Sequence, residues 1–170
     1  MKDAKRRSST PARPDLLSIK VEDLMIPAVN VAYVEPHHAL DHALLILIKS
    51  GYSAIPVLER GERVRGTISK TLILDSILGL EQIEVDKLRD RQVAEVMNAD
   101  VPRLHAQDTM MKALELSISR PFLCVEAEDG TFLGLVTRSA ILERVHAYCR
   151  WLKAQSVRTS HPQPDADAVQ

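Results

Sequence analysis

The sequence predicts an α/β protein in which two β-α-β-β-α units pack against each other. Two observations lead to this fold class. Short strings recur in the same order at offsets of 70 and then 68 residues. Within each copy, apolar residues follow helical spacing first and strand-like runs afterwards. A unit of about 60 residues buries too little apolar surface to be secure alone, so the units should share a core and leave a cleft between them.

Four landmarks define the duplication, and a loop two residues shorter in the second copy accounts for the change of offset. The matches, in chain order, are 31–34 with 101–104, 43–44 with 113–114, 56–57 with 124–125, and 66–69 with 134–137.

The first copy begins with a β-rich segment at 31–34. A helix follows, because apolar residues recur at helical spacing and Gly51 is placed to cap its C-terminus. Residues 54–58 predict a strand that turns at Gly61, and a third strand leads to Gly66. A second helix is expected to start at Ser69. The apolar residues of the first helix are Ala39, Leu40, Ala43, Leu44 and Leu47.

The second copy repeats this order from the segment 101–104. Asp108 is expected to cap the helix that follows it. A strand at 122–126 turns at Asp129-Gly130, a further strand leads to Gly134, and a last helix is expected to start at Thr137. The apolar residues assigned to the first of these helices are Met111, Leu114 and Ile118.

Composition divides the chain into five segments. Residues 1–15 are expected to be a disordered basic leader, because the first twenty residues hold six bases and two acids and little that can be buried. The two units then occupy 16–80 and 93–155, with a connector at 81–92. Residues 156–170, rich in Pro, Asp and Ala, are expected to be a disordered tail.

The overall composition excludes several classes of protein. A net charge of −1 does not indicate nucleic-acid binding. No segment approaches the roughly 20 apolar residues that span a bilayer. Cys124 and Cys149 form neither a disulfide framework nor a metal cluster, so a cytoplasmic location is expected. No catalytic constellation and no metal site are predicted, and the pair His38 and His42 is interpreted as part of a solvated helix face.

A duplicated Gly-x-x-Ser/Thr motif is the main candidate for ligand chemistry. It places a hydroxyl, Ser69 or Thr137, at the start of a helix, where unpaired N–H groups attract anions. A cation follows one residue later, as Lys70 or Arg138. The glycine permits close approach of a ligand to the backbone. The sequence therefore predicts two phosphate-binding positions, although an ordinary helix cap followed by a solvated base would give the same pattern.

The motif and the repeat together resemble the CBS family, whose motif pairs fold into a Bateman module that binds adenosine compounds and commonly forms a homodimer. More narrowly, the chain is similar to stand-alone CBS proteins of Gram-positive bacteria that bind cyclic di-AMP. The strings that carry this likeness are 51–58 (GYSAIPVL), 79–84 (GLEQIE), 101–105 (VPRLH) and 122–126 (FLCVE).

This resemblance implies a set of ligand-binding residues: Asn30, Ala32, Tyr52, Ala54, Ser69, Lys70, Thr137, Arg138 and Ser139. Adenosine-binding CBS motifs usually carry an Asp three residues after the Ser/Thr, where it binds the ribose. Leu72 and Ala140 occupy those positions, which favours cyclic di-AMP over linear nucleotides but also fits a decayed site. The close relatives have Lys at Asn30 and Arg at Ser139, so we expect weaker phosphate contacts here.

The function expected from the resemblance is that of a non-enzymatic regulator with no cofactor. The chain would bind cyclic di-AMP between its CBS motifs and modulate a separate partner protein, with a (p)ppGpp synthetase/hydrolase or pyruvate carboxylase as candidates. Two alternatives remain open. The chain could sense AMP, ADP or ATP, or it could act as a dimeric scaffold without a ligand.

Overall fold

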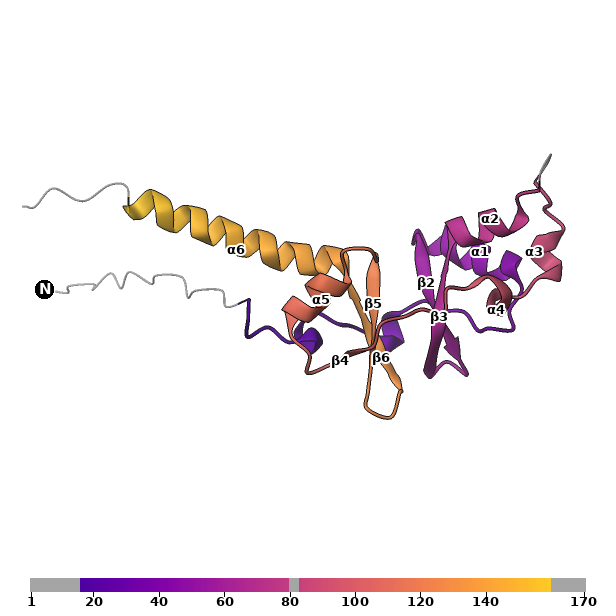
Figure 1. Cartoon of the computed structure of the whole chain (residues 1–170), viewed down its shortest axis with the longest axis horizontal. Helices are drawn as coiled ribbons and strands as arrows, with labels where there is room; N and C mark the ends of the chain where they lie inside the picture. The colour runs from indigo at the N-terminus through magenta and orange to yellow at the C-terminus, as the bar shows by residue number, and fades with distance from the viewer. Residues whose placement is uncertain (1–15, 80–82, 160–170) are drawn as a thin grey trace, which may run out of the picture.

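A computed structural model describes residues 16–79 and 83–159. Two antiparallel hairpins, β2–β3 and β5–β6, stand side by side at the centre, and the helices lie at the two outer ends (Figure 1). One sheet has the strand order β1-β6-β5-β4 and the other consists of β2 and β3. Within the described ranges, no helix has the length and apolar character needed to cross a membrane. The two sheets, with helices at their outer ends, confirm the predicted α/β class.

The first motif follows the predicted order of elements. Its opening segment is shorter than predicted, since only Val34 forms a bridge, parallel to Val57. Gly51 ends the first helix with a left-handed φ of 76°, which confirms the predicted cap. The elements are α1 (Leu40–Ser50), β2 (Ala54–Glu59), β3 (Arg63–Ser69) and α2 (Lys70–Ile77), followed by α3 (Lys87–Asp90) and α4 (Val93–Val96).

The second motif has the same order. Its short first strand runs parallel to its second, and the last two strands form an antiparallel hairpin. The elements are β4 (Leu104–His105), α5 (Met110–Leu116), β5 (Phe122–Glu126), β6 (Phe132–Thr137) and α6 (Arg138–Thr159). The last helix therefore includes 156–159, which we had assigned to the tail. No Pro or Gly interrupts the chain before Pro162, so nothing in the sequence ends the helix at 155.

Two details of the second motif's first helix were predicted incorrectly. Its cap is Thr109, whose side chain accepts a hydrogen bond from the Lys112 N–H, while Asp108 accepts from the His105 N–H. The buried side chains are Met110 and Ala113, whereas Met111 is 43% and Ile118 is 77% exposed. The repeat offset of 70 maps Leu40 and Ala43 onto these buried positions, so the repeat was a better guide than the local spacing.

The core of each motif is completed by the opening segment of the other motif. Val21, in η1 (Val21–Asp23), is buried in the core of the second motif with Leu104 and Val136. Val93 is buried in the core of the first motif. The strand β1 (Ile26–Pro27), which leads into η2 (Ala28–Asn30), pairs antiparallel with β6. A third core, which includes Leu58 and Phe122, lies between the motifs and joins them.

The two motif glycines serve this exchange of segments. A Cβ at Gly66 would lie 2.6 Å from the Asn98 carbonyl oxygen, and a Cβ at Gly134 would collide with the Ile26 carbonyl oxygen. Gly134 also has a backbone φ of 156°, which residues with a side chain rarely adopt. The sequence interpretation assigned these glycines to the approach of a ligand. In the structure, the backbone that approaches each glycine belongs to the opening segment of the opposite motif.

Candidate functional site

Two pockets lie where the motifs meet, and the repeat relates them to each other. Pocket 1 has a volume of about 350 Å³ and pocket 2 of about 420 Å³. Both volumes fall at the lower end of the range of small-molecule sites, which is roughly 300–1,000 Å³. Each pocket combines the Ser/Thr end of one motif with the start of the central hairpin of both motifs. Ser53, Ala54, Pro121 and Phe122 line both pockets.

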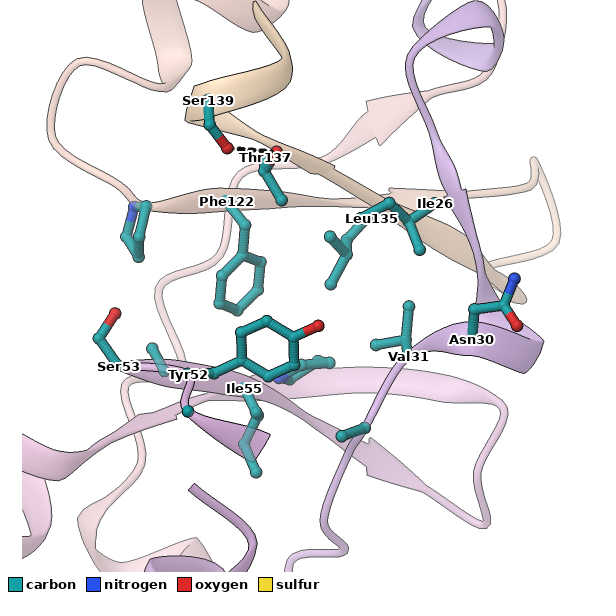
Figure 2. A pocket seen from close by; sticks show the side chains of 15 residues that line it. Ile26, Asn30, Val31, Tyr52, Ser53, Ile55, Phe122, Leu135, Thr137 and Ser139 are labelled. Carbon is teal, nitrogen blue, oxygen red and sulfur yellow. Dashed lines mark hydrogen bonds between the residues drawn. The ribbon is translucent and has the colours of Figure 1, made fainter. Parts of the chain in front are cut away.

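Pocket 1 has apolar walls and hydroxyl groups at one end. Phe122 and Leu135, from the second motif, point toward Tyr52 at the start of the first motif's hairpin (Figure 2). The Thr137 and Ser139 hydroxyls contact each other at 3.0 Å. Asn30 lies at the opposite end of the pocket from these hydroxyls (Figure 2). Aromatic faces and a few convergent polar groups are typical of a site for a flat heterocyclic ligand.

Pocket 2 is more polar and carries charge. Its lining includes Ser69 and Thr71 from the first motif, and Asp100, Ser119 and Arg120 from the segments that flank the second motif's strands. The Arg120 guanidinium Nη2 lies 3.4 Å from the Asp100 carboxylate oxygen Oδ2.

A buried thiol lies in the wall of pocket 2. Removal from water, with a smaller effect of the nearby Glu126 carboxylate, raises the pKa of Cys124 to about 12. The thiol is therefore not a nucleophile at neutral pH. Cys124 therefore forms part of the apolar wall of the pocket.

The repeat pairs the residues of the two pockets one by one. At the helix starts, Thr137 corresponds to Ser69 and Ser139 to Thr71, so the hydroxyls are kept. At the other positions the chemistry changes. Pocket 2 has Asp100 where pocket 1 has Asn30, Arg120 where it has Tyr52, and Cys124 where it has Pro56.

The structure divides the predicted site residues among three places. Pocket 1 gathers six of them: Asn30, Ala32, Tyr52, Ala54, Thr137 and Ser139. Ser69 lines pocket 2, where Ala54 is shared. Lys70 and Arg138 are not among the lining residues of either pocket. Tyr52 is 52% exposed, so its side chain lies at the surface of the cleft and not in the core.

The helix starts make the same hydrogen bonds in both motifs. Ser69 Oγ accepts from the Leu72 N–H, and Thr137 Oγ1 accepts from the Ala140 N–H. These caps confirm that the helices begin after the two hydroxyl residues. Each hydroxyl keeps its own O–H for donation to a neighbour or a ligand.

The cations of the motif are also engaged at their backbones. The Lys70 N–H donates to the Ser53 carbonyl, and the Arg138 N–H donates to the Pro121 carbonyl. The matched bonds hold each helix start against the first residues of its own hairpin. An N–H group predicted to face an anion is thus satisfied within the protein at both positions.

Arg138 has a further role that Lys70 does not share. Its Nε donates to the Ser117 carbonyl at 2.9 Å and to the Arg120 carbonyl at 3.0 Å. Ser117 follows the last residue of α5, where helical carbonyls lack partners. The Arg138 side chain therefore fixes the segment between α5 and β5, which carries the polar edge of pocket 2.

Sequence reasoning missed several residues of the pockets. Phe122 was predicted to lie in a strand and Leu135 in the link between a strand and a helix, and only the assembled fold brings both side chains into the cleft. Arg120 and Asp100 were not considered, although the repeat offset assigns them to the positions of Tyr52 and Asn30. A position-by-position comparison of the two copies would have found them.

His37, His38 and His42, for which the sequence predicts no metal site, are not among the lining residues of either pocket. The rings of His37 and His38, and those of His38 and His42, are 4.7 Å apart. His38 Nδ1 accepts from the Glu35 N–H at 3.1 Å. Burial, with a smaller contribution from the neighbouring imidazoles, lowers the pKa of His38. Across 16–79 and 83–159, no cluster of three or more His, Cys, Asp or Glu residues is arranged to hold a metal ion.

Comparisons with known proteins agree with this arrangement. The CBS domain model matches residues 21–79 and 93–147. The chain is 44% identical to cyclic di-AMP receptor B of Bacillus subtilis over 137 residues, which cover 81% of this chain and 93% of that protein.

Solved structures give the same result. A CBS domain-containing protein of Bacillus anthracis is 48% identical, with a TM-score of 0.74, over 78% of this chain and 96% of that one. The CbpB protein of Listeria monocytogenes in complex with c-di-AMP is 41% identical, with a TM-score of 0.70, over 75% of this chain and 96% of that one. The chain belongs to the CBS domain family and contains a pair of CBS motifs.

Proposed function

We propose that this chain is a cytoplasmic regulator that binds cyclic di-AMP in pocket 1 and passes the signal to a separate partner protein. The observation that carries the proposal is the composition of pocket 1. Residues from both motifs, which the resemblance had assigned to a ligand, meet in one cavity. The similarity to cyclic di-AMP receptor B and to CbpB in complex with c-di-AMP supports the choice of ligand.

The chemistry of pocket 1 fits an adenine better than a phosphate. Tyr52 and Phe122 offer aromatic faces on which a base can stack. The Thr137 and Ser139 hydroxyls supply hydrogen bonds at one end. No charged side chain is among the lining residues. Contacts to the phosphates would therefore come mainly from hydroxyl and backbone groups, which agrees with the expectation of weaker binding than in the close relatives.

The positions next to the helix caps favour a cyclic dinucleotide over a linear one. Leu72 lines pocket 2 and Ala140 follows Ser139 of pocket 1, so neither motif places a carboxylate there. A free ribose with two hydroxyls gains from such a carboxylate. The ribose of cyclic di-AMP has its 3′ oxygen esterified and loses less when the carboxylate is missing.

Calorimetry with the full chain tests the ligand. We expect cyclic di-AMP to bind in the micromolar range and AMP, ADP and ATP to bind pocket 1 more weakly. Tyr52→Ala should weaken cyclic di-AMP binding by about ten-fold, because a stacked base is lost. Tyr33→Ala, at an exposed tyrosine outside both pockets, is the matched control. No heat with cyclic di-AMP at tens of micromolar would contradict the proposal, and tighter binding of a linear nucleotide would favour an energy sensor.

We also propose that the chain forms a homodimer through its helices. Large apolar side chains are exposed at matching positions of the two motifs: Ile48 and Ile118, and Leu74 and Leu142. Apolar positions repeated on the outer faces of both motifs are typical of a surface that another copy covers. Sedimentation equilibrium should give twice the chain mass, and the double variant Leu74→Glu/Leu142→Glu should give the monomer mass.

The regulatory part of the proposal requires a partner that distinguishes the free form from the bound form. The candidates are a (p)ppGpp synthetase/hydrolase and pyruvate carboxylase. Each can be titrated against the chain with and without cyclic di-AMP. Equal affinity for a candidate under both conditions would remove it, and a partner bound equally well by the Tyr52→Ala variant and the wild type would favour a ligand-independent scaffold.

A further inference from the structure

The charged side chains that line the two pockets are Arg120 and Asp100, and both lie in pocket 2. Pocket 1 has Tyr52 and Asn30 at the matching positions. The pockets therefore share a backbone frame but differ in their ability to bind an anion. A cation in a cleft is the group that can pair with a phosphate.

The two partners differ in exposure. The Arg120 side chain is 31% exposed, whereas that of Asp100 is 89% exposed. The cation thus lies inside the pocket and the anion lies at its rim, in water. Water screens an exposed carboxylate strongly, so Asp100 cancels little of the positive potential that Arg120 creates within the pocket.

The hydrogen bonds that hold Arg120 in place are long. Its Nη2 lies 3.4 Å from the Asp100 carboxylate, and its Nη1 donates to Ser119 Oγ at 3.3 Å. Contacts of this length, one of them to a well-solvated carboxylate, contribute little free energy. A phosphate could replace Asp100 with a shorter, two-pronged contact, because the guanidinium group matches the geometry of phosphate oxygens.

The segment that carries Arg120 is itself well anchored. The Arg120 carbonyl accepts from Arg138 Nε, and so does the Ser117 carbonyl. The backbone at Arg120 therefore stays in place when the side chain exchanges one partner for another. Arg138 acts here as a positioning residue, through the backbone of its neighbour.

The remainder of pocket 2 suits the other parts of a nucleotide. Ser69 and Thr71 provide hydroxyls close to the start of α2, whose N-terminus favours negative charge. Val101, Phe122 and Leu123 form an apolar wall. A ligand with a flat apolar portion and one phosphate group would meet both surfaces at once.

We propose that Arg120 is a specificity-determining residue, which binds the phosphate of an adenine nucleotide in pocket 2 by exchanging Asp100 for it. Pocket 2 then selects phosphorylated over neutral nucleosides, and pocket 1 makes no such selection. The inference rests on the proposed function, in which the cleft between the motifs takes adenine nucleotides, and extends it from pocket 1 to pocket 2. It assigns the anion-binding role to a residue outside the Gly-x-x-Ser/Thr motif.

AMP and adenosine are the probes, because they differ only in the phosphate. Calorimetry with the full chain, in the presence and absence of saturating cyclic di-AMP, should show that AMP binds about ten-fold more tightly than adenosine. Arg120→Gln should bring the two affinities within about two-fold of each other. Asp100→Asn should strengthen AMP binding by about three-fold and leave adenosine unchanged, since it frees the guanidinium group without altering shape.

Two controls separate this inference from loss of structure. Arg120→Gln keeps the backbone carbonyl that Arg138 binds, and unchanged urea unfolding will show that the fold is intact. Arg103→Gln removes an exposed arginine outside both pockets and should leave the ratio of AMP to adenosine affinity unchanged.

The outcomes distinguish the two proposals. An absence of heat with cyclic di-AMP contradicts the function proposed for pocket 1 and leaves the comparison of AMP with adenosine valid. A ratio that Arg120→Gln does not lower, a loss of AMP affinity in Asp100→Asn, or no AMP binding to the wild-type chain at millimolar concentration would each overturn the role of Arg120.

Discussion

The two pockets have the same frame and different linings. In both, a hydroxyl caps the helix and the next residue's N–H binds the carbonyl at the start of the hairpin. In both, a glycine lies against the opening segment of the other motif. The linings differ where no backbone bond depends on the side chain: Tyr52 faces pocket 1 and Arg120 faces pocket 2. The two motifs thus share their helix caps and glycine contacts, whereas the chemistry of their pocket linings differs.

The largest difference that we expect between the pockets is chemical. Pocket 2 has Cys124 where pocket 1 has Pro56, and burial raises the pKa of this thiol to about 12. Because this pKa is about three units above that of an ordinary cysteine, the thiolate fraction of Cys124 at pH 8 is about a thousand-fold lower. Alkylation of Cys124 by iodoacetamide in the Cys149→Ser variant should be slower than that of a model thiol by this factor, as mass spectrometry can measure.

The pH dependence gives the check on this prediction. The thiolate is the charged form that burial disfavours, so the alkylation rate should rise about ten-fold per pH unit with no plateau below pH 10. A plateau near pH 9 would mean that Cys124 is exposed in solution and that the wall of pocket 2 is open.

The glycines should show the second largest difference. Gly134→Ala places a Cβ against the Ile26 carbonyl oxygen at a φ of 156°. Gly66→Ala places one 2.6 Å from the Asn98 carbonyl oxygen. We expect Gly134→Ala to lower the free energy of unfolding by roughly 3 kcal/mol and Gly66→Ala by roughly 2 kcal/mol, because only the first adds backbone strain to the clash.

Urea unfolding of the two variants measures this difference. Equal losses for the two motif glycines would mean that the strand β1 moves away from β6 at little cost. The exchange of segments would then contribute less to the stability of the second motif than the buried Val21 indicates.

The glycines also show where sequence reasoning succeeded and where it stopped. The duplication and the order of elements were predictable, because helix caps at Ser69 and Thr137 and the turn at Gly51 are local signals. The packing of Val21 and Val93 in the opposite motifs was not, since periodicity reports that a residue is buried but not which core receives it. For the same reason, the glycines were assigned to a ligand.

The candidate site was predictable to a similar extent. Six of its residues meet in pocket 1, because the resemblance carried over positions that lie on the segments where the two motifs meet. Arg138 was expected to face a phosphate, but its Nε binds two carbonyls of a neighbouring segment. A long side chain can reach many partners within the fold, and the sequence pattern around it contains no information about which one it selects.

Arg138 provides the third test of the comparison, since its counterpart Lys70 makes no matching side-chain bond among the described residues. Arg138→Gln should lower the free energy of unfolding by about 2 kcal/mol, because two carbonyls lose a charged donor. Lys70→Gln should change it by less than about 0.5 kcal/mol. Hydrogen exchange should also become faster at the amides of residues 118–120 in Arg138→Gln alone. Similar effects of the two substitutions would contradict the positioning role of Arg138.

The smallest expected difference concerns the helix caps, which the pockets share. Thr137→Val and Ser69→Ala each remove a side-chain acceptor from an N–H in the first turn, and each should cost about 1 kcal/mol of stability. Thr137→Ser keeps the acceptor and should restore the stability almost fully.

Measurements of ligand binding distinguish the role of the Thr137 hydroxyl as a helix cap from its role as a contact to the ligand. Thr137 Oγ1 faces pocket 1 beside Ser139, so Thr137→Val should also weaken cyclic di-AMP binding, whereas Ser69→Ala should not. Calorimetry on both variants decides between two accounts of the duplicated hydroxyl. If both substitutions lower stability and neither lowers affinity, the Gly-x-x-Ser/Thr motif serves the fold alone, and recognition depends on the residues at which the two pockets differ.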